Sequence, residues 1–395
     1  MGSVIARIIR VLPDLIVMVA ALAGQLFSAW WGWRHMARYP DPARRRARSA
    51  IAAACGISTA VLLFGVLLRF DRVLRHFPKG DWHAWTRGVI IAWMLVSLSW
   101  LLGFAIVRWL AKRSAAPHSA TRRHFLRTAH AAAFAAPPAV VGAMFVQRNR
   151  IELREHKIEI PGLPPALDGL RLVQLTDIHM GPFLSRRDLK RAVAMANETR
   201  AHVALVTGDL ITNSGDPLDD CLDALAALRA EAGVFGCLGN HEQYADAQDY
   251  SEREGARRGL RFLRQTAAPL RFGNATLNLA GVDYQRLRQP YLVGAEKMIQ
   301  PEAFNLLLSH NPDVFPVAAR QGFPLTISGH THGGQVRVEI LSADLNMARF
   351  YTPYVDGLYR QDAASIFVSR GIGTIGIPAR FGAPPEVSLL TLKRV

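Results

Sequence analysis

Residues 170–179, Leu-Arg-Leu-Val-Gln-Leu-Thr-Asp-Ile-His, decide the fold, because an apolar run typical of a buried strand leads directly into Asp177 and His179. Four later strand candidates end in the same way, in Gly208-Asp209, Gly239-Asn240-His241-Glu242, His310 and Gly329-His330-Thr331-His332. Ligands of an α/β sheet bind beyond the carboxyl ends of its strands. We therefore expect these five loops to converge on one site.

The polar residues at these strand ends form a coherent set of metal-ligand types. Two carboxylates, four histidines and one asparagine suit Mn, Fe or Zn better than Ca or Mg alone. Asp-x-His and His-x-His place two donors on one side of an extended segment. Glycines 208, 239 and 329 precede ligand candidates and permit close backbone approach. The seven candidates are Asp177, His179, Asp209, Asn240, His310, His330 and His332.

The order of these motifs resembles that of the calcineurin-like metallophosphoesterase superfamily, over about Ile151 to Val395. Segments Ser309–Asp313, Ser328–Gln335 and Pro378–Glu386 are further similar to its bacterial branch of membrane-anchored or exported phosphodiesterases. The resemblance implies an α/β fold with a β-sandwich flanked by helices. It also implies a hydrolase that acts on phosphoric esters with two divalent ions.

The resemblance also implies a role for each candidate. Asp177, His179 and His332 would hold one ion, and Asn240, His310 and His330 the other. Asp209 would bridge both ions. His241 would not be a ligand, and would act near the leaving group as a general acid or hydrogen-bond donor.

Two neighbouring features of the sequence bear on the site. Glu242 is expected either to orient His241 or to lie exposed to solvent. The glycine-rich segment Gly371–Gly376 follows a strand candidate, but no helix-forming run follows it. We therefore expect a turn there rather than a nucleotide-binding loop.

The remaining pattern of the C-terminal part alternates strands and helices, as in an α/β domain. Ser185 with Asp188 three residues later predicts a capped helix start. A second helix is expected over Leu218 to Ala232. The strand candidates are Leu170–Thr176, His202–Thr207, Gly233–Leu238, Phe304–Leu308, Pro324–Ser328, Ile366–Ser369 and Val387–Leu392.

The first 150 residues differ in charge and hydropathy from residues 151–395. They hold 21 Lys and Arg against 4 Asp and Glu, whereas the rest holds 26 against 27. Half of the whole chain is hydrophobic. Since the positive excess lies between apolar runs, it indicates membrane topology rather than nucleic-acid binding. We expect a transmembrane region over 1–150 and a catalytic domain over 151–395, with spans near 12–33, 50–68, 88–107 and 128–146.

The fourth apolar run has two interpretations. Thr121-Arg122-Arg123-His124-Phe125-Leu126-Arg127 precedes it and resembles a twin-arginine export signal, although at an internal position. The alternative is a spanning helix with basic flanks. The distribution of arginines favours a C-terminal domain outside the cytoplasm. If the fourth run does not span, that domain is cytoplasmic.

The sequence thus predicts a multi-pass protein of the inner (plasma) membrane. The protein is expected to hydrolyse phosphate esters, particularly phosphodiesters, and its substrate is expected to be lipid-linked or nucleotide-linked. One alternative is a pyrophosphatase for a UDP-linked acylated sugar of lipid precursor synthesis at the cytoplasmic face. Another is a non-catalytic scaffold or membrane sensor on the same fold. No nucleic-acid partner is expected. The three cysteines, Cys55, Cys221 and Cys237, have no metal-type spacing and are expected to be free thiols.

Overall fold

The computed structural model describes residues 19–34, 36–38, 40–69, 81–113, 120–286, 290–340 and 343–395. The chain divides into an N-terminal unit, Met1–Ala143, and a C-terminal unit, Met144–Val395. The two units are described separately below.

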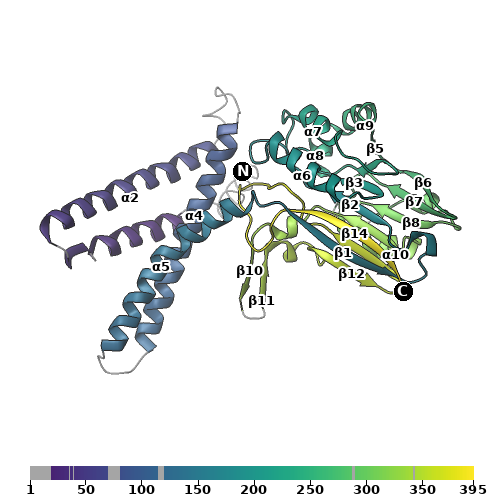
Figure 1. Cartoon of the computed structure of the whole chain (residues 1–395). Helices are drawn as coiled ribbons and strands as arrows, with labels where there is room; N and C mark the ends of the chain where they lie inside the picture. The colour runs from purple at the N-terminus through teal and green to yellow at the C-terminus, as the bar shows by residue number, and fades with distance from the viewer. Residues whose placement is uncertain are drawn as a thin grey trace, which may run out of the picture. The chain divides into compact units, whose positions relative to one another are not determined.

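The C-terminal unit contains two six-stranded sheets and a short hairpin (Figure 1). The first sheet has the order β1-β14-β2-β3-β4-β5, and β2 to β5 run parallel. Strand β14 lies between the edge strand β1 and β2, and pairs parallel with β1 and antiparallel with β2. Its strands are β1 (Glu152–Ile160), β2 (Arg171–Leu175), β3 (Val203–Thr207), β4 (Val234–Cys237), β5 (Leu260–Phe262) and β14 (Glu386–Arg394).

The second sheet has the order β12-β13-β9-β8-β7-β6. Its four central strands are parallel and its two outer strands antiparallel to their neighbours. Its strands are β6 (Thr266–Phe272), β7 (Ala275–Gly281), β8 (Phe304–Leu308), β9 (Leu325–Ser328), β12 (Gly357–Gln361) and β13 (Ala364–Val368), and the hairpin is β10 (Arg337–Ile340) with β11 (Ala343–Asn346).

Alternating side chains of the strands explain the layered packing. In β3, Val203 and Leu205 belong to a core shared by both sheets, whereas Ala204 and Val206 belong to a core on the opposite face. In β8, Leu306 lies in the shared core and Leu307 outside it. Because successive strand residues point to opposite faces, each sheet buries one face against the other sheet and one against helices. The α/β fold with two sheets is therefore as predicted.

Helices cover the outer faces of the sandwich. Helix α6 begins after Ser185, whose hydroxyl accepts from the Asp188 backbone N–H at 3.2 Å, as the capping pattern predicted. The helices are α6 (Arg186–Glu198), α7 (Leu218–Leu225), α8 (Asn240–Tyr244), α9 (Gln248–Arg257) and α10 (Phe315–Gln321), with 3₁₀ turns η2 (Pro165–Leu167), η3 (Ala295–Met298), η4 (Pro312–Val314), η5 (His332–Gly334) and η6 (Met347–Phe350).

Helix α7 is shorter than the predicted 218–232 segment. It ends at Leu225 because Asn197 of α6 binds the chain beyond it. The Asn197 side chain donates to the Ala227 carbonyl at 2.8 Å and accepts from the Arg229 N–H at 2.8 Å. These bonds engage the backbone groups that a continuing helix would use, so the helix stops.

The N-terminal unit is helical. Its described helices are residues 19–34, η1 (Met36–Arg38), α2 (Asp41–Arg69), α4 (Asp81–Arg113) and α5 (Ala120–Gln147), the last of which continues into the C-terminal unit. Trp31 and Phe104 pack at 5.3 Å between ring centroids, and the Trp100 indole donates to the Phe134 carbonyl at 2.8 Å. Aromatic packing therefore joins three of these helices.

Two described helices are long and apolar enough to cross a membrane, judged by length and composition alone: Ala84–Leu110 and His124–Gln147. They contain the predicted spans 88–107 and 128–146. The predicted span 50–68 lies within α2, whose side chains are described only in part, and span 12–33 is described only from residue 19. The expected bundle of three to four spans is therefore not confirmed.

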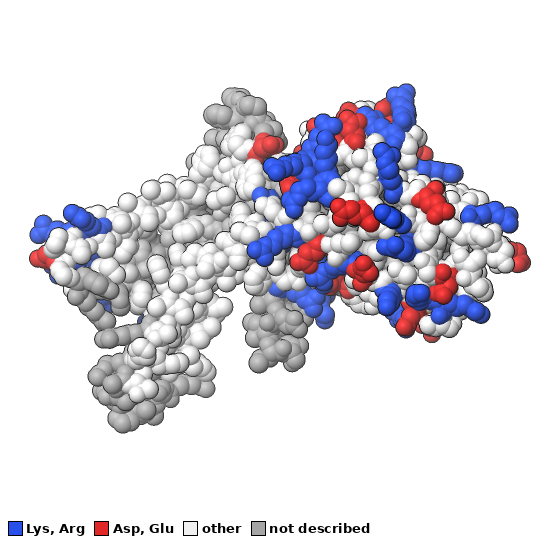
Figure 2. All heavy atoms as spheres, in the orientation of Figure 1, with Lys and Arg blue, Asp and Glu red and all other residues white. Residues whose placement is uncertain are grey.

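Charge follows the division of the chain. The visible face of the C-terminal unit carries Lys, Arg, Asp and Glu intermingled, while the described helices of the N-terminal unit are largely uncharged along their length (Figure 2). Cys221 and Cys237 are buried and Cys55 is half-buried, and all three are free thiols, as expected.

Candidate metal centre

The predicted residues come from loops at the carboxyl ends of strands in both sheets. Strands β2, β3 and β4 of the first sheet lead into Asp177 and His179, Asp209, and Asn240 and His241, whereas β8 and β9 of the second lead into His310 and into His330 and His332. The site therefore lies where the two sheets meet, and not at the edge of a single open sheet.

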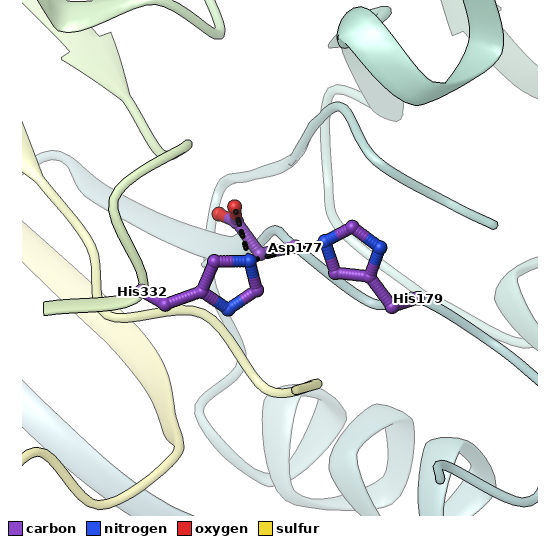
Figure 3. Close-up of side chains that lie close together, drawn as sticks. All are labelled: Asp177, His179 and His332. Atoms are coloured by element: carbon purple, nitrogen blue, oxygen red, sulfur yellow. Dashed lines mark hydrogen bonds and ion pairs between the residues drawn. The ribbon is translucent and has the colours of Figure 1, made fainter. Parts of the chain in front are cut away.

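Asp177, His179 and His332 form one cluster of possible metal ligands, and their ligand atoms lie within 4.8 Å of one another (Figure 3). The Nε2 atoms of the two histidines are 3.1 Å apart. The His332 Nε2 atom lies 3.4 Å from a carboxylate oxygen of Asp177. All three side chains are buried.

Asp209 lies in the two other clusters of ligand types found among the described residues, one with His179 and His241 and one with His310 and His330. Its Oδ2 atom is 3.0 Å from the His310 Nε2 atom and 3.5 Å from the His179 Nε2 atom. One carboxylate therefore contacts both halves of the predicted ligand set.

Asn240 provides a test of whether these residues fit a metal ion. Its side chain is 5% exposed, and its Oδ1 atom has no hydrogen-bond partner among the described residues. A buried acceptor without a partner costs about 1–3 kcal/mol. A cation beside this oxygen would remove that cost, so the donor set fits a divalent ion.

Hydrogen bonds fix the rings of three histidines through their Nδ1 atoms. His310 Nδ1 lies 2.7 Å from the Thr207 carbonyl, and His241 Nδ1 lies 2.6 Å from the Thr212 carbonyl. His179 Nδ1 lies 3.1 Å from the Thr212 hydroxyl. A carbonyl that accepts from Nδ1–H leaves Nε2 as the free nitrogen, which is the tautomer that a metal ligand requires.

The backbone is strained at most of the predicted ligands. Five of the seven have positive φ: Asp177 (50°), His179 (47°), Asp209 (55°), His330 (80°) and His332 (53°). This left-handed conformation is uncommon for residues other than glycine, and such strain gathers at functional sites. The distortion supports a site that the surrounding structure holds in place.

All three predicted glycines lie directly against ligand side chains. A Cβ atom at Gly208 would lie 2.7 Å from the His310 Nδ1 atom. A Cβ atom at Gly239 would lie 2.1 Å from an Asp209 carboxylate oxygen, and one at Gly329 would lie 2.3 Å from an oxygen of Asp177. Any larger residue would displace these carboxylates. The glycines therefore have the close-approach role predicted for them.

Burial and ion pairing set the protonation of the site. Burial opposes the charge of His310, but the adjacent Asp209 carboxylate outweighs burial and raises the pKa of His310 to about 10. Burial likewise opposes ionisation of Asp209, yet His310 holds its pKa well below the usual value. Burial lowers the pKa of His179 to about 3 and that of His330 to about 4. Metal ions bind neutral imidazoles and ionised carboxylates. His179, His330 and Asp209 are therefore in the binding form, whereas His310 must lose a proton before it can bind an ion.

Glu242 does neither of the two things expected of it. It is fully buried, and its carboxylate accepts from the backbone N–H groups of Asp209, Leu210 and Gly239 at 3.0, 2.7 and 2.7 Å. It therefore binds two ligand-bearing loops together and does not orient the His241 ring. The spacing from Gly239, three residues before the carboxylate at a helix start, was the available signal.

A cavity of about 330 Å³ adjoins the ligands. His330 and His332 line it together with Asp313, Tyr351 and Ile375, among others. His241 is not part of its lining. The cavity thus offers space beside His330 and His332.

Comparisons with known proteins found sequence similarity to metallophosphoesterases. The sequence profile of the calcineurin-like phosphoesterase family matches residues 170–334, which include every predicted site residue. An uncharacterised metallophosphoesterase of Bacillus subtilis, YkuE, is 28% identical over 69% of this chain and 98% of its own length.

A zebrafish (Danio rerio) transmembrane protein with a metallophosphoesterase domain is 33% identical over 60% of this chain. The chain spans 56% of the length of that relative. Among solved structures, the sulfate thiohydrolase SoxB of Thermus thermophilus aligns with a TM-score of 0.36 at 16% identity, over 59% of this chain and 58% of that one.

Proposed function

Because the chain contains a calcineurin-like metallophosphoesterase domain, which makes it a hydrolase of phosphoric esters, we propose that it is a phosphodiesterase that uses two divalent ions. Asp177, His179 and His332 hold one ion, and Asn240, His310 and His330 hold the other. Asp209 bridges them. The observation that carries this proposal is the position of the Asp209 carboxylate, in contact with His179 on one side and His310 on the other.

The mixed oxygen and nitrogen donors favour Mn, Fe or Zn. Two such ions supply Lewis acidity at the phosphoryl group and a nucleophile derived from water near neutral pH. The protein residues supply the rest. His241 donates a proton to the leaving oxygen from Nε2, because its Nδ1–H is bound to the Thr212 carbonyl.

A diester is favoured over a monoester because a diester carries a second organic group. Beside His241 there must be space for the group that leaves. The cavity along His330, His332 and Tyr351 supports a site for the group that stays on phosphorus, since His241 does not line it.

The test compares two aspartates with the same backbone conformation. Asp209 has φ 55°, and Asp362, in an exposed turn, has φ 54°. Asp209→Asn in the full chain in detergent should abolish manganese-dependent hydrolysis of bis(p-nitrophenyl) phosphate and lower the metal content per chain. Asp362→Asn should change neither. Full activity of Asp209→Asn would refute the proposal, and a higher kcat/KM for p-nitrophenyl phosphate than for the diester would refute the diester preference.

The proposed location is the inner (plasma) membrane, with several spans and the catalytic unit outside the cytoplasm. The two apolar helices and the transmembrane relative support membrane attachment. The rival pyrophosphatase for a UDP-linked acylated sugar needs the cytoplasmic side. An alkaline-phosphatase fusion after Val395 should be active under this proposal, and an inactive but stable fusion would favour the rival.

A further inference from the structure

Arg380 is a buried cation that the proposed reaction does not use. Its side chain is fully buried and is the largest side chain so enclosed in the described parts of the chain. None of the described carboxylates lies within ion-pair distance of its guanidinium group. Burial lowers the pKa of Arg380 to about 10, and the more distant carboxylates of Asp177 and Glu386 offset this only in part. A buried charge without a directly paired carboxylate is costly. We therefore expect Arg380 to have a role that requires its charge or its hydrogen bonds, which an apolar residue could not provide.

The guanidinium donates instead to backbone carbonyls of three segments. Nη1 donates to the His332 carbonyl at 2.8 Å, to the Arg370 carbonyl at 2.9 Å and to the Ala383 carbonyl at 3.3 Å. Nε donates to the Gly373 carbonyl at 3.1 Å, and Nη2 donates to the carbonyls of Gly371 and Gly373. The five N–H groups of the planar guanidinium can reach all of these acceptors at once if one Nη1–H is shared between two carbonyls.

The glycine segment held by Arg380 lies against the other end of the ligand cluster. Gly373 N–H donates to the Asp177 carbonyl at 2.7 Å, and Ile372 N–H donates to the Thr176 carbonyl at 3.1 Å. A Cβ atom at Gly371 would lie 2.5 Å from the Asp177 Cβ atom. Arg380 thus links the backbone of His332 to the backbone of Asp177 through the glycine segment that lies between them.

Arg380 also lies near the His332 ring, with Nη2 3.3 Å from Nδ1. A guanidinium only donates, so this contact is a hydrogen bond only when the proton of the imidazole is on Nε2. A ring that binds a metal through Nε2 cannot be in that form. The carbonyl contacts, and not this one, therefore carry the argument.

We propose that Arg380 is a positioning residue that holds His332 and Asp177 at the spacing required to bind one ion of the pair. The inference rests on the proposed function, and it adds a residue that touches neither ion nor substrate. Lysine keeps the charge but offers three donors on a single atom, which cannot span the carbonyls of three segments. The role therefore requires the guanidinium shape as well as its charge.

The test measures metal binding to the full chain in detergent. Arg380→Lys should bind one manganese ion roughly 10–100-fold more weakly, as is usual when a partner of a metal ligand is lost. The second ion should bind as in the wild type, and the electron paramagnetic resonance signal of a coupled manganese pair should disappear at limiting metal. Arg258→Lys is the matched control, because Arg258 pairs with surface carboxylates of Asp223 and Glu254.

A second variant separates positioning from folding. Arg380→Ala should lose the same ion and regain it when guanidinium ions, but not ammonium ions, are added. Two ions bound with wild-type affinity by Arg380→Lys would overturn the inference. It would also be overturned if neither variant folds even with guanidinium, since the residue would then support the whole fold. A wild-type chain that binds no metal would instead refute the proposed function.

Discussion

Glu242→Gln tests whether one buried carboxylate holds the candidate site together. Each carboxylate oxygen accepts from two backbone N–H groups: Oε1 from Leu210 and Ile211 at 2.7 and 3.5 Å, and Oε2 from Asp209 and Gly239 at 3.0 and 2.7 Å. Glutamine replaces one oxygen by an NH₂ group, which donates. Either orientation of the amide leaves two buried N–H groups without an acceptor.

The cost can be worked from those two groups. Each unsatisfied buried N–H group costs about 1–3 kcal/mol, so the variant should lose about 2–6 kcal/mol. Domains are typically stable by only about 5–15 kcal/mol. For a domain of about 150–250 residues, 1 kcal/mol shifts Tm by roughly 2–4 °C. Tm should therefore fall by at least about 4 °C, and metal affinity should fall with it, because the loosened loops carry Asp209 and Asn240.

Differential scanning calorimetry of the full chain is the suitable assay. All eight tryptophans lie at or before Trp109, so tryptophan fluorescence would report only the N-terminal unit. Glu302→Gln makes the same chemical change at an exposed position and should leave Tm unchanged. A Glu242→Gln variant with the Tm and metal content of this control would refute the reasoning.

Three further outcomes are expected. Gly239→Ala should lose bound metal and activity, because its Cβ atom would lie 2.1 Å from an Asp209 oxygen; atomic absorption measures the loss, and full metal content would contradict it. His241→Ala should slow hydrolysis about 100- to 10,000-fold for an alkyl leaving group but far less for p-nitrophenol, which leaves without a proton; equal losses would exclude a general-acid role. Because the pKa of His310 is about 10 in the metal-free site, the ring is protonated near neutral pH, and metal binding should release a proton. Metal affinity should then rise as pH rises toward that pKa, with up to roughly tenfold per pH unit from this group; calorimetry in buffers of different ionisation heat would detect the proton, and a zero count would contradict the assignment.

Sequence reasoning succeeded where a local pattern carries the information. The apolar run before Asp177 predicted β2 to within one residue at each end. The motifs also contain the residues that form the three clusters of ligand types, while the role of each residue stays a prediction. The pattern did not reveal that the loops come from two sheets. Strand β8 precedes His310, and its apolar sequence would be the same in the sheet of β4 or in a sheet packed against it. Pairing between strands that are distant in sequence leaves no local signal.

The supporting residues were missed for a related reason. Arg380 and Glu242 bind backbone groups. Because every residue has a backbone carbonyl, and all but proline an N–H group, such contacts leave no pattern in the sequence of the partner residues. Arg380 also lies 48 residues beyond the His332 carbonyl that it binds. The end of α7 was misplaced likewise, because Asn197 of another helix determines it.

The position of the ligands at the seam between the two sheets has a consequence for folding. Ions bound there would be held by loops of both sheets. They would therefore link the two sheets across the shared core. Neither half could swing away without giving up its share of the coordination. Removal of the metal should therefore lower the free energy required to separate the two sheets. The cooperativity of thermal unfolding, measured by calorimetry, should increase as cations are added back.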